Sequence, residues 1–194
     1  MAKVKNPNDI VDEFVSDYRK VLDDQLISVI MYGSAVTHEY RPGKSDINMA
    51  IVVRENSISV LNRVVEVQKK WGRRSIAPPF FMTEEYIASS LDTYPIEFFN
   101  MQSNYRVLYG TDVLAGLDIK KGDLRLQCER ELRGIALHLR KGFVQAGGDG
   151  RLLGELVDLS FKKLLPILKA LLVLHGSRIP HIKSETIGLI EDIY

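Results

Sequence analysis

One stretch near the amino terminus, from Leu26 to Arg54, constrains the fold of this chain more than any other. It opens with an apolar run of strand length that Gly33 ends, and a second apolar run spans 49–53. Between the two runs, the segment 41–44 (Arg-Pro-Gly-Lys) has the composition of a turn. The stretch therefore predicts two strands joined by a glycine turn and a short looped or helical excursion.

Polar residues stand at the two inner ends of these strands. Gly33 and Ser34 offer free backbone N–H groups and a hydroxyl, which favours phosphate binding at this turn. We expect the second strand to begin at Ser45, and side chains alternate along a strand. Asp46 and Asn48 then point to the same face, with Cα atoms about 7 Å apart. Because Mg²⁺ prefers such oxygen ligands, the pattern predicts a Mg²⁺–nucleotide site.

The order of these residues resembles the signature of the polymerase-β-like nucleotidyltransferases, which is an apolar strand, Gly-Ser, and then Asp-x-Asp on a second strand. Asp46 matches the first aspartate, whereas Asn48 stands where the family has its second. The resemblance implies an α+β fold with a mixed sheet and flanking helices. It also implies that the nucleotide is bound by the Gly-Ser turn and by the end of the following loop. The expected nucleotide-binding residues are Gly33, Ser34, Lys44 and Ser45.

In the resembled enzymes, metal ions bridge the nucleotide triphosphate and the acceptor hydroxyl. The resemblance therefore implies Mg²⁺ as cofactor and ATP or another NTP as substrate. Asp46 is expected to be catalytic and to bridge the metals, while Asn48 supplies a neutral carbonyl. The family has a third carboxylate on a later strand, and Glu97 lies in a strand-like segment, 95–99. Glu97 is expected to be catalytic and to complete the set of metal ligands. The alternative is that Glu97 has no such role and lies on the solvent-facing side of a half-buried strand.

Two classes of function remain open. The first is an enzyme that transfers NMP from an NTP to a hydroxyl on a small molecule, a protein or RNA. The second is a nucleotide-binding or regulatory protein that keeps the fold without the chemistry. Asn48 favours the second class, because a neutral ligand binds Mg²⁺ more weakly than a carboxylate. A plain β-turn-β unit with a solvated Asp and Asn is the purely structural alternative.

The rest of the first half completes a sheet domain. Apolar residues at helical spacing predict helices over about 9–22 and 57–72. The basic run at 69–74 lies at the end of the second helix. Cations there are favoured by the helix dipole, so solvated side chains are a better interpretation than a contact with phosphate. A proline-containing segment, 77–82, is typical of an edge strand, and 105–109 predicts another strand. Because strands and helices alternate here, we expect an α+β domain at 1–118.

Residues 119–194 show three apolar stripes at helical spacing, which predict an all-α helical bundle. This architecture is similar to that of kanamycin nucleotidyltransferase-like enzymes and of minimal nucleotidyltransferase–HEPN proteins. The third stripe is cut short at Tyr194, so an apolar face is expected to stay uncovered. We therefore expect a homodimer through this domain.

Two polar pairs in this half have competing interpretations. Arg133 and His138 have an R-x4-H spacing that resembles the HEPN ribonuclease motif. Five residues along a helix place the two on different faces, which favours ordinary surface residues. Glu155 and Asp158 share one side of a helix and suit either a general base or a solvated face.

Composition and charge limit the partners and the cellular compartment that we expect for this chain. A net charge of +1 creates no global basic field that would argue for nucleic acid. The single cysteine, Cys128, excludes an intrachain disulfide and suits a reducing cytosol, so a cytoplasmic protein is expected. Its place on an apolar helical face favours packing over a nucleophile. Since no run of about 18 apolar residues occurs, we expect no membrane span.

Overall fold

The computed structural model describes residues 4–74, 76–180 and 183–194. The chain divides into two compact units, and each is described by itself. The sheet unit comprises Met1–Ser90 and Asn100–Asp118, and the helical unit comprises Leu91–Phe99 and Ile119–Tyr194. None of the helices in the described residues combines the length and the apolar character that a membrane span requires.

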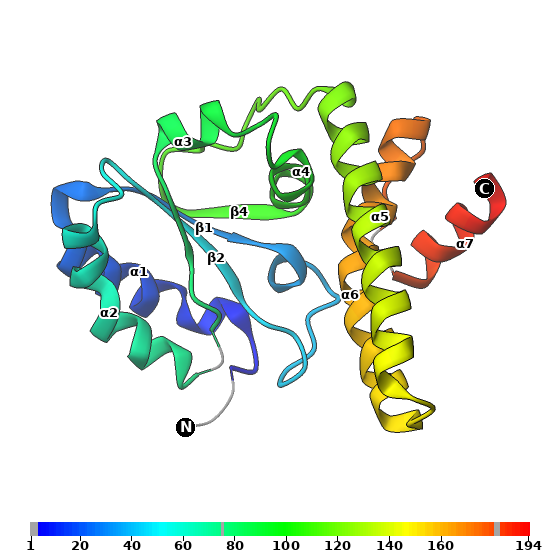
Figure 1. Ribbon diagram of the computed structural model, residues 1–194. Helices are drawn as coiled ribbons and strands as arrows, with labels where there is room; N and C mark the ends of the chain where they lie inside the picture. The colour runs from blue at the N-terminus through cyan, green and yellow to red at the C-terminus, as the bar shows by residue number, and fades with distance from the viewer. Residues whose placement is uncertain (1–3, 75, 181–182) are drawn as a thin grey trace. The chain divides into compact units, whose positions relative to one another are not determined.

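The sheet unit is built on a four-stranded mixed sheet with the order β3-β2-β1-β4 (Figure 1). β1 pairs antiparallel with both β2 and β4, and β2 pairs parallel with β3. The edge position of β3 follows from the prolines before it, which donate no ladder hydrogen bond. The sheet confirms the predicted α+β class. The strands are β1 (Leu26–Tyr32), β2 (Asn48–Val53), β3 (Phe80–Met82) and β4 (Tyr105–Gly110).

Helices cover both sides of this sheet. Figure 1 shows α1 (Val11–Leu22) and α2 (Ile58–Gly72) against one face and α3 (Glu84–Ser89) on the opposite side. The cap hydroxyl of Ser57 accepts the Val60 N–H at 3.4 Å at the start of α2. Short 3₁₀ helices join the elements, and these are η1 (Pro7–Ile10), η2 (Asp23–Gln25) and η3 (Gly33–Val36).

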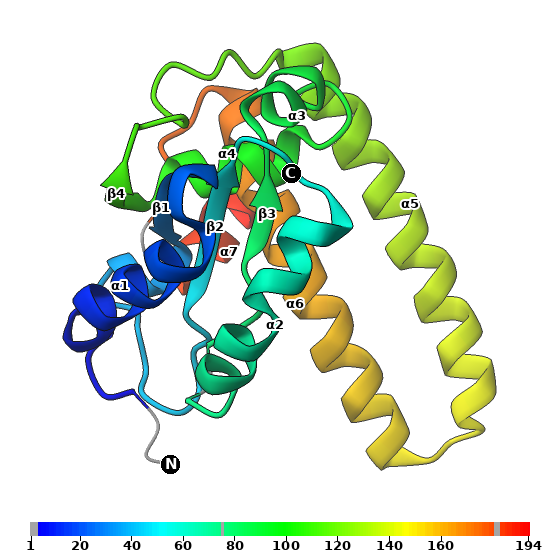
Figure 2. The ribbon, with the colours of Figure 1, turned by 90° about the vertical axis from the view of Figure 1, so that its left-hand side faces the viewer.

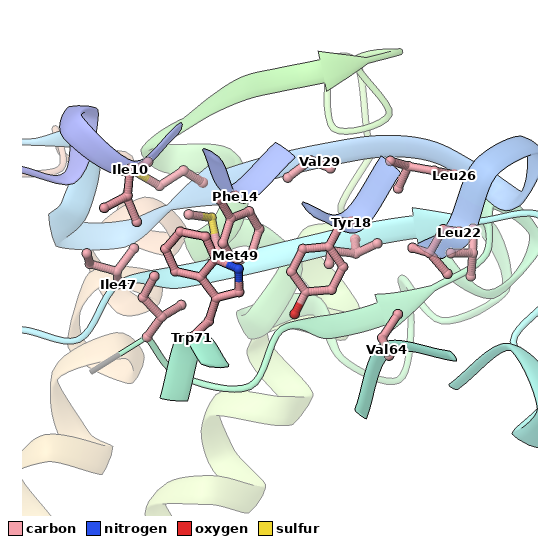
Figure 3. Close-up of a cluster of buried hydrophobic side chains, with 14 of the residues drawn as sticks. Ile10, Phe14, Tyr18, Leu22, Leu26, Val29, Ile47, Met49, Val64 and Trp71 are labelled. Carbon is pink, nitrogen blue, oxygen red and sulfur yellow. The ribbon is translucent and has the colours of Figure 1, made fainter. Parts of the chain in front are cut away.

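An aromatic cluster forms the centre of the core between α1, α2 and the sheet (Figure 3). The ring centroid of Phe14 lies 4.6 Å from that of Tyr18 and 5.2 Å from that of Trp71. All three side chains are fully buried. Because aromatic side chains bury large apolar areas, this cluster holds both helices on the sheet. The alternating residues of β2 face it as predicted, namely Met49, Ile51 and Val53.

A charged network at the rim of this core ties α1 to the end of α2. Lys70 Nζ lies 2.6 Å from Asp17 Oδ2 and 2.8 Å from Glu13 Oε1. Arg74 pairs with the other Glu13 oxygen at 2.6 Å, and Trp71 Nε1 donates to Asp17 at 3.1 Å. The cations of the basic run 69–74 that lie nearest the core therefore pair with carboxylates of α1.

The segment 95–99 corrects a sequence prediction. It is not a strand but the first part of helix α4 (Pro95–Ser103). Pro95 occupies the first helical position, where its fixed φ and missing N–H suit a helix start. The Phe98 N–H donates to the Tyr94 carbonyl at 3.2 Å. A five-residue apolar run does not distinguish a strand from a buried helix, and here the proline decides.

The helical unit is all-α, as predicted. Figure 2 shows α5 and α6 as a long antiparallel hairpin, and α7 follows α6 in the chain. A Cβ at Gly142 would lie 2.6 Å from a methyl of Leu156, so an alanine there would require the Leu156 side chain to move. Cys128 is buried, and burial raises the pKa of its thiol to about 11, which confirms a packing role. The helices are α5 (Lys121–Ala146), α6 (Gly150–His175) and α7 (Lys183–Ile193).

The charged network predicts a pH-dependent contribution to stability. Hydrogen bonds from Lys70, and then from Arg74, hold the pKa of Glu13 below its ordinary value of 4.5. A carboxyl with a lowered pKa stabilises the fold above its unfolded-state value, and this contribution disappears as pH falls through the folded-state value. Because the Glu13 side chain is 48% exposed, Glu13→Gln should lower the free energy of unfolding by less than about 1 kcal/mol at neutral pH.

Urea denaturation at neutral pH and in acid, below the ordinary value of 4.5, tests this expectation. The difference between Glu13→Gln and wild type should shrink in acid, because the protonated carboxyl resembles the amide. Glu66→Gln is the matched control, since Glu66 pairs with Lys69 on the outer surface of α2. An equal difference at both pH values would exclude the ionic origin.

Candidate functional site

The turn after β1 is the first element of the site. Gly33 has φ +76°, a left-handed backbone that glycine adopts without strain. Its N–H donates to the Asn104 carbonyl at 2.8 Å, so the free N–H expected at Gly33 is already bonded. The Ser34 carbonyl accepts both the backbone N–H and the hydroxyl of Thr37, each at 3.1 Å. In the described part of the chain the Ser34 hydroxyl makes no hydrogen bond, so it remains available to a ligand.

The start of β2 lies directly against this turn. Tyr32 faces Asn48 across the β1–β2 ladder. A Cβ built on Gly33 would lie 3.4 Å from Asn48 Nδ2, so the half-buried amide lies next to the turn. β2 begins at Asn48 and not at Ser45 as expected, and Ile47 forms an isolated bridge. Ile47 is nevertheless buried while Asp46 is exposed, which is the alternation that the sequence predicted.

The loop between η3 and β2 contributes a residue that sequence reasoning missed. The Tyr40 hydroxyl donates to the Val4 carbonyl at 2.9 Å. Burial raises the pKa of Tyr40, and the nearby Asp46 carboxylate raises it further. Tyr40 therefore fixes the loop beside Asp46. A lone tyrosine in an otherwise polar loop was the signal in the sequence.

The turn at 41–45 is held by its own backbone. The Arg41 carbonyl accepts the N–H groups of Lys44 and Ser45 at 3.0 and 2.9 Å. The Ser45 hydroxyl in turn accepts the Arg41 N–H at 3.0 Å. The Lys44 side chain is exposed. These two residues lie on the turn that leads into Asp46, and their contact with a nucleotide stays a prediction.

The structure thus brings four of the predicted residues to one end of the sheet, namely Gly33, Ser34, Asp46 and Asn48. Among the residues described, no three His, Cys, Asp or Glu side chains gather into a metal-binding group. Mg²⁺ typically takes one or two protein carboxylates and completes its ligands with substrate phosphates and water. The exposed Asp46 carboxylate and the Asn48 carbonyl fit that kind of ion.

Glu97 lies in the helical unit, and the expectation that it lies on the sheet was wrong. It occupies the first turn of α4, and its carboxylate accepts a hydrogen bond from Gln127 Nε2 at 2.9 Å. Gln127 Oε1 accepts the Ile96 N–H at 2.8 Å. The Gln127 side chain is buried while Glu97 is exposed, so a buried amide orients a surface carboxylate.

Gln127 was also missed from the sequence, although it left a signal. It stands beside Cys128 on the apolar stripe of α5, where a polar residue needs a partner. The other polar pairs of this unit belong to exposed helix faces. Arg133 pairs with Glu129 at 2.8 Å, and Glu155 lies 3.9 Å from Arg151. These contacts are typical of solvated helices.

No protein-family model and no curated protein sequence matches this chain. Among solved structures, it is similar to the crystal structure of spectinomycin adenyltransferase AAD(9) from Enterococcus faecialis with ATP and spectinomycin. The TM-score is 0.51 at 15% sequence identity, over 94% of this chain and 83% of that chain. The chain has a nucleotidyltransferase-type fold. At this identity the likeness shows the fold alone, and the resemblance of the helical half to HEPN domains stays a prediction.

The Gly33 turn generates a stability prediction. Gly33→Ala should lower the free energy of unfolding by about 1–2 kcal/mol, because an L residue is strained in a left-handed backbone. The new Cβ would lie in ordinary van der Waals contact with the Asn48 side chain, 3.4 Å from Nδ2, so the expected cost comes from the backbone alone. Gly134→Ala in α5 is the control, since a Cβ there meets nothing within 4 Å. The control should be neutral or more stable by up to about 1 kcal/mol. Equal effects in urea denaturation would contradict the strain at Gly33.

Proposed function

We propose that this protein is a nucleotidyltransferase that transfers NMP from an NTP, with ATP as the first candidate, to a hydroxyl group. The observation that carries the proposal is the pairing of Tyr32 with Asn48, which sets the Gly33 turn beside the strand entry at Asp46 at one end of a sheet of this fold. The structural neighbour supports it, because its title describes an adenyltransferase with ATP.

The site residues divide into those that hold phosphate and those that hold a cation. The free Ser34 hydroxyl donates to a phosphate oxygen, and Lys44 and Ser45 are proposed as further nucleotide-binding residues. Asp46 supplies a carboxylate to Mg²⁺, and Asn48 supplies its carbonyl oxygen. When bound, Mg²⁺ neutralises negative charge that develops on the phosphate oxygens. The sheet holds these groups in fixed positions, which favours transfer by orientation.

In the proposed step the acceptor hydroxyl oxygen bonds to the α-phosphorus, its proton passes to a base, and pyrophosphate leaves. The resemblance assigns the base and the third carboxylate to Glu97, and that role stays a prediction. Within the helical unit, Gln127 Nε2 donates to the Glu97 carboxylate at 2.9 Å, which orients this carboxylate.

The acceptor is proposed to be a small molecule, with protein and RNA hydroxyls as the other classes. The neighbour's title names spectinomycin, so small molecules come first in a substrate screen. The alternative function is a nucleotide-binding or regulatory protein of the same fold. Asn48 favours that alternative, because it removes one negative charge from the cation ligands.

Nucleotide binding at several Mg²⁺ concentrations separates these functions without knowledge of the acceptor. By calorimetry, Asp46→Asn should remove the Mg²⁺-dependent part of ATP affinity, a loss of about tenfold or more, equivalent to about 1.4 kcal/mol. Asn48→Asp should tighten Mg²⁺-dependent binding, because it adds a charged ligand. In EDTA the same variant should melt slightly earlier, because its two carboxylates repel each other.

Glu85→Gln, an exposed acid in the first turn of α3, is the matched control and should bind ATP like wild type. Glu97→Gln should bind ATP normally and lose transfer in any acceptor screen that shows activity. If ATP binding depends on Mg²⁺ in neither wild type nor Asn48→Asp, the proposal of an enzyme is wrong and the binding function remains.

We also propose that the protein forms a homodimer through α5 and α6. Eight of the fourteen large apolar side chains exposed in the described residues lie on these two helices. A cavity of about 450 Å³ near their connection is lined almost wholly by apolar groups, including Phe143, Val144 and Val157. Two helical hairpins that pair face to face cover such surfaces on both copies. A net charge of +1 creates little repulsion between copies.

Light scattering at micromolar concentration should show a dimer for wild type and a monomer for a Phe143→Asp/Val144→Asp variant. Both side chains are more than half exposed, at 66% and 79%, so the variant should fold normally. Ile58→Asp on α2, where the side chain is 74% exposed, is the control and should remain dimeric. A monomeric wild type would end this proposal.

A further inference from the structure

A cavity of about 450 Å³ lies beside η3 in the sheet unit, and none of the residues assigned to the proposed reaction lines it. Its walls come from the amino-terminal residues 5–8, the loop 35–40 and the start of β4. Lys5, His38 and Arg106 line it, and no carboxylate does. The larger groove between α1 and β4 also has two cations, but three aspartates accompany them, namely Asp12, Asp23 and Asp24. The cavity beside η3 is therefore the more cationic of the two.

Sheet pairing brings Arg106 to this cavity. Across the β1–β4 ladder, Arg106 faces Met31 and Tyr105 faces Tyr32, the last residue before the turn. The Gly33 N–H donates a hydrogen bond to the Asn104 carbonyl, which extends the β1–β4 pairing by one residue. The start of β4 is thus fixed beside the predicted phosphate-binding turn. The Tyr105 hydroxyl also donates to Asp112 at 2.9 Å, which holds this wall in place.

The core brings Lys5 to the opposite wall. Val4 is 7% exposed and packs into the main core cluster. Its carbonyl accepts the Tyr40 hydroxyl at 2.9 Å, which joins the amino-terminal segment to the loop 35–40. Lys5 follows directly, with an exposed side chain that lines the cavity. Two residues far apart in sequence therefore meet at one hollow.

These two cations have no partner in the described part of the chain. Neither Lys5 nor Arg106 makes an ion pair or a side-chain hydrogen bond there. Like charges around one concave surface raise its positive potential, and such a surface concentrates anions. A guanidinium offers a planar fork to phosphate oxygens, and an ammonium adds a compact charge. The pair is thus suited to a group with several anionic oxygens.

We propose that this cavity binds a phosphate-bearing ligand, held by Lys5 and Arg106. The inference rests on the proposed function only for the source of the phosphate. One source is the polyphosphate tail of the nucleotide, since the cavity adjoins the Gly33 turn. The other is a phosphate group on the acceptor. The shared chemistry is the same in both cases, and the experiment distinguishes the two.

Inorganic tripolyphosphate is the probe, with binding measured by calorimetry at low and at physiological ionic strength. The Lys5→Ala/Arg106→Ala variant should bind it at least tenfold more weakly than wild type. The salt dependence of the remaining affinity should also be smaller, because fewer charges are involved. Arg106→Lys should retain part of the affinity. Lys20→Ala, an exposed cation of the groove between α1 and β4, is the control and should bind like wild type.

Both substituted side chains are exposed, so the variants should fold, and melting without ligand verifies this. Tripolyphosphate should raise the melting temperature of wild type and not that of the double variant. Equal tripolyphosphate affinity in wild type and the double variant would overturn the proposal.

A competition arm then identifies the source of the phosphate. Displacement of tripolyphosphate by ATP means that the cavity takes the nucleotide's own phosphates. Simultaneous binding of both means that it takes a phosphate of the acceptor. The outcomes for the two proposals are separable. If tripolyphosphate binds wild type but not the double variant while ATP binding shows no Mg²⁺ dependence, that result would contradict the proposed reaction and support the phosphate site in this cavity.

Discussion

The pairing of β1 with two antiparallel neighbours is the constraint on which the rest of the sheet unit depends. β1 contributes Val29, Ile30 and Met31, which are all fully buried, so both of its faces lie in apolar surroundings. Each ladder has one register irregularity along β1, and beyond it Tyr32 pairs with Asn48 on one side and with Tyr105 on the other. These pairs set the positions at which β2 and β4 begin.

Polar groups collect where these ladders end. β1, which is apolar except for buried Ser28, gives way at Tyr32 to a glycine turn, and the neighbouring strands begin there with Asn48 and Tyr105. Burial raises the pKa of Tyr32 to about 12, which marks the border between core and polar surface. Beyond that border Asn48 and Tyr105 are half-buried and Asp46 is exposed, and all three are attached to a rigid frame. This combination suits a binding site better than a free loop does.

The charge pattern at this end of the sheet is asymmetric. Asp46 is the carboxylate of the strand entry, and the cavity beside η3 carries Lys5 and Arg106. A second carboxylate at position 48 would repel the first unless a cation lay between them. Under the proposed function, the neutral amide of Asn48 avoids that repulsion and would bind Mg²⁺ more weakly than a carboxylate at this position.

The sequence by itself determined the elements whose signals are local. The apolar run of β1, the turn at Gly33, the alternation along 46–53 and the helical second half were all predictable, because periodicity and turn residues act over a few positions. Tertiary structure decided the rest. It placed buried Gln127 against Glu97 and brought Lys5 to the same cavity as Arg106. These features depend on contacts between residues distant in the chain, which no local pattern encodes.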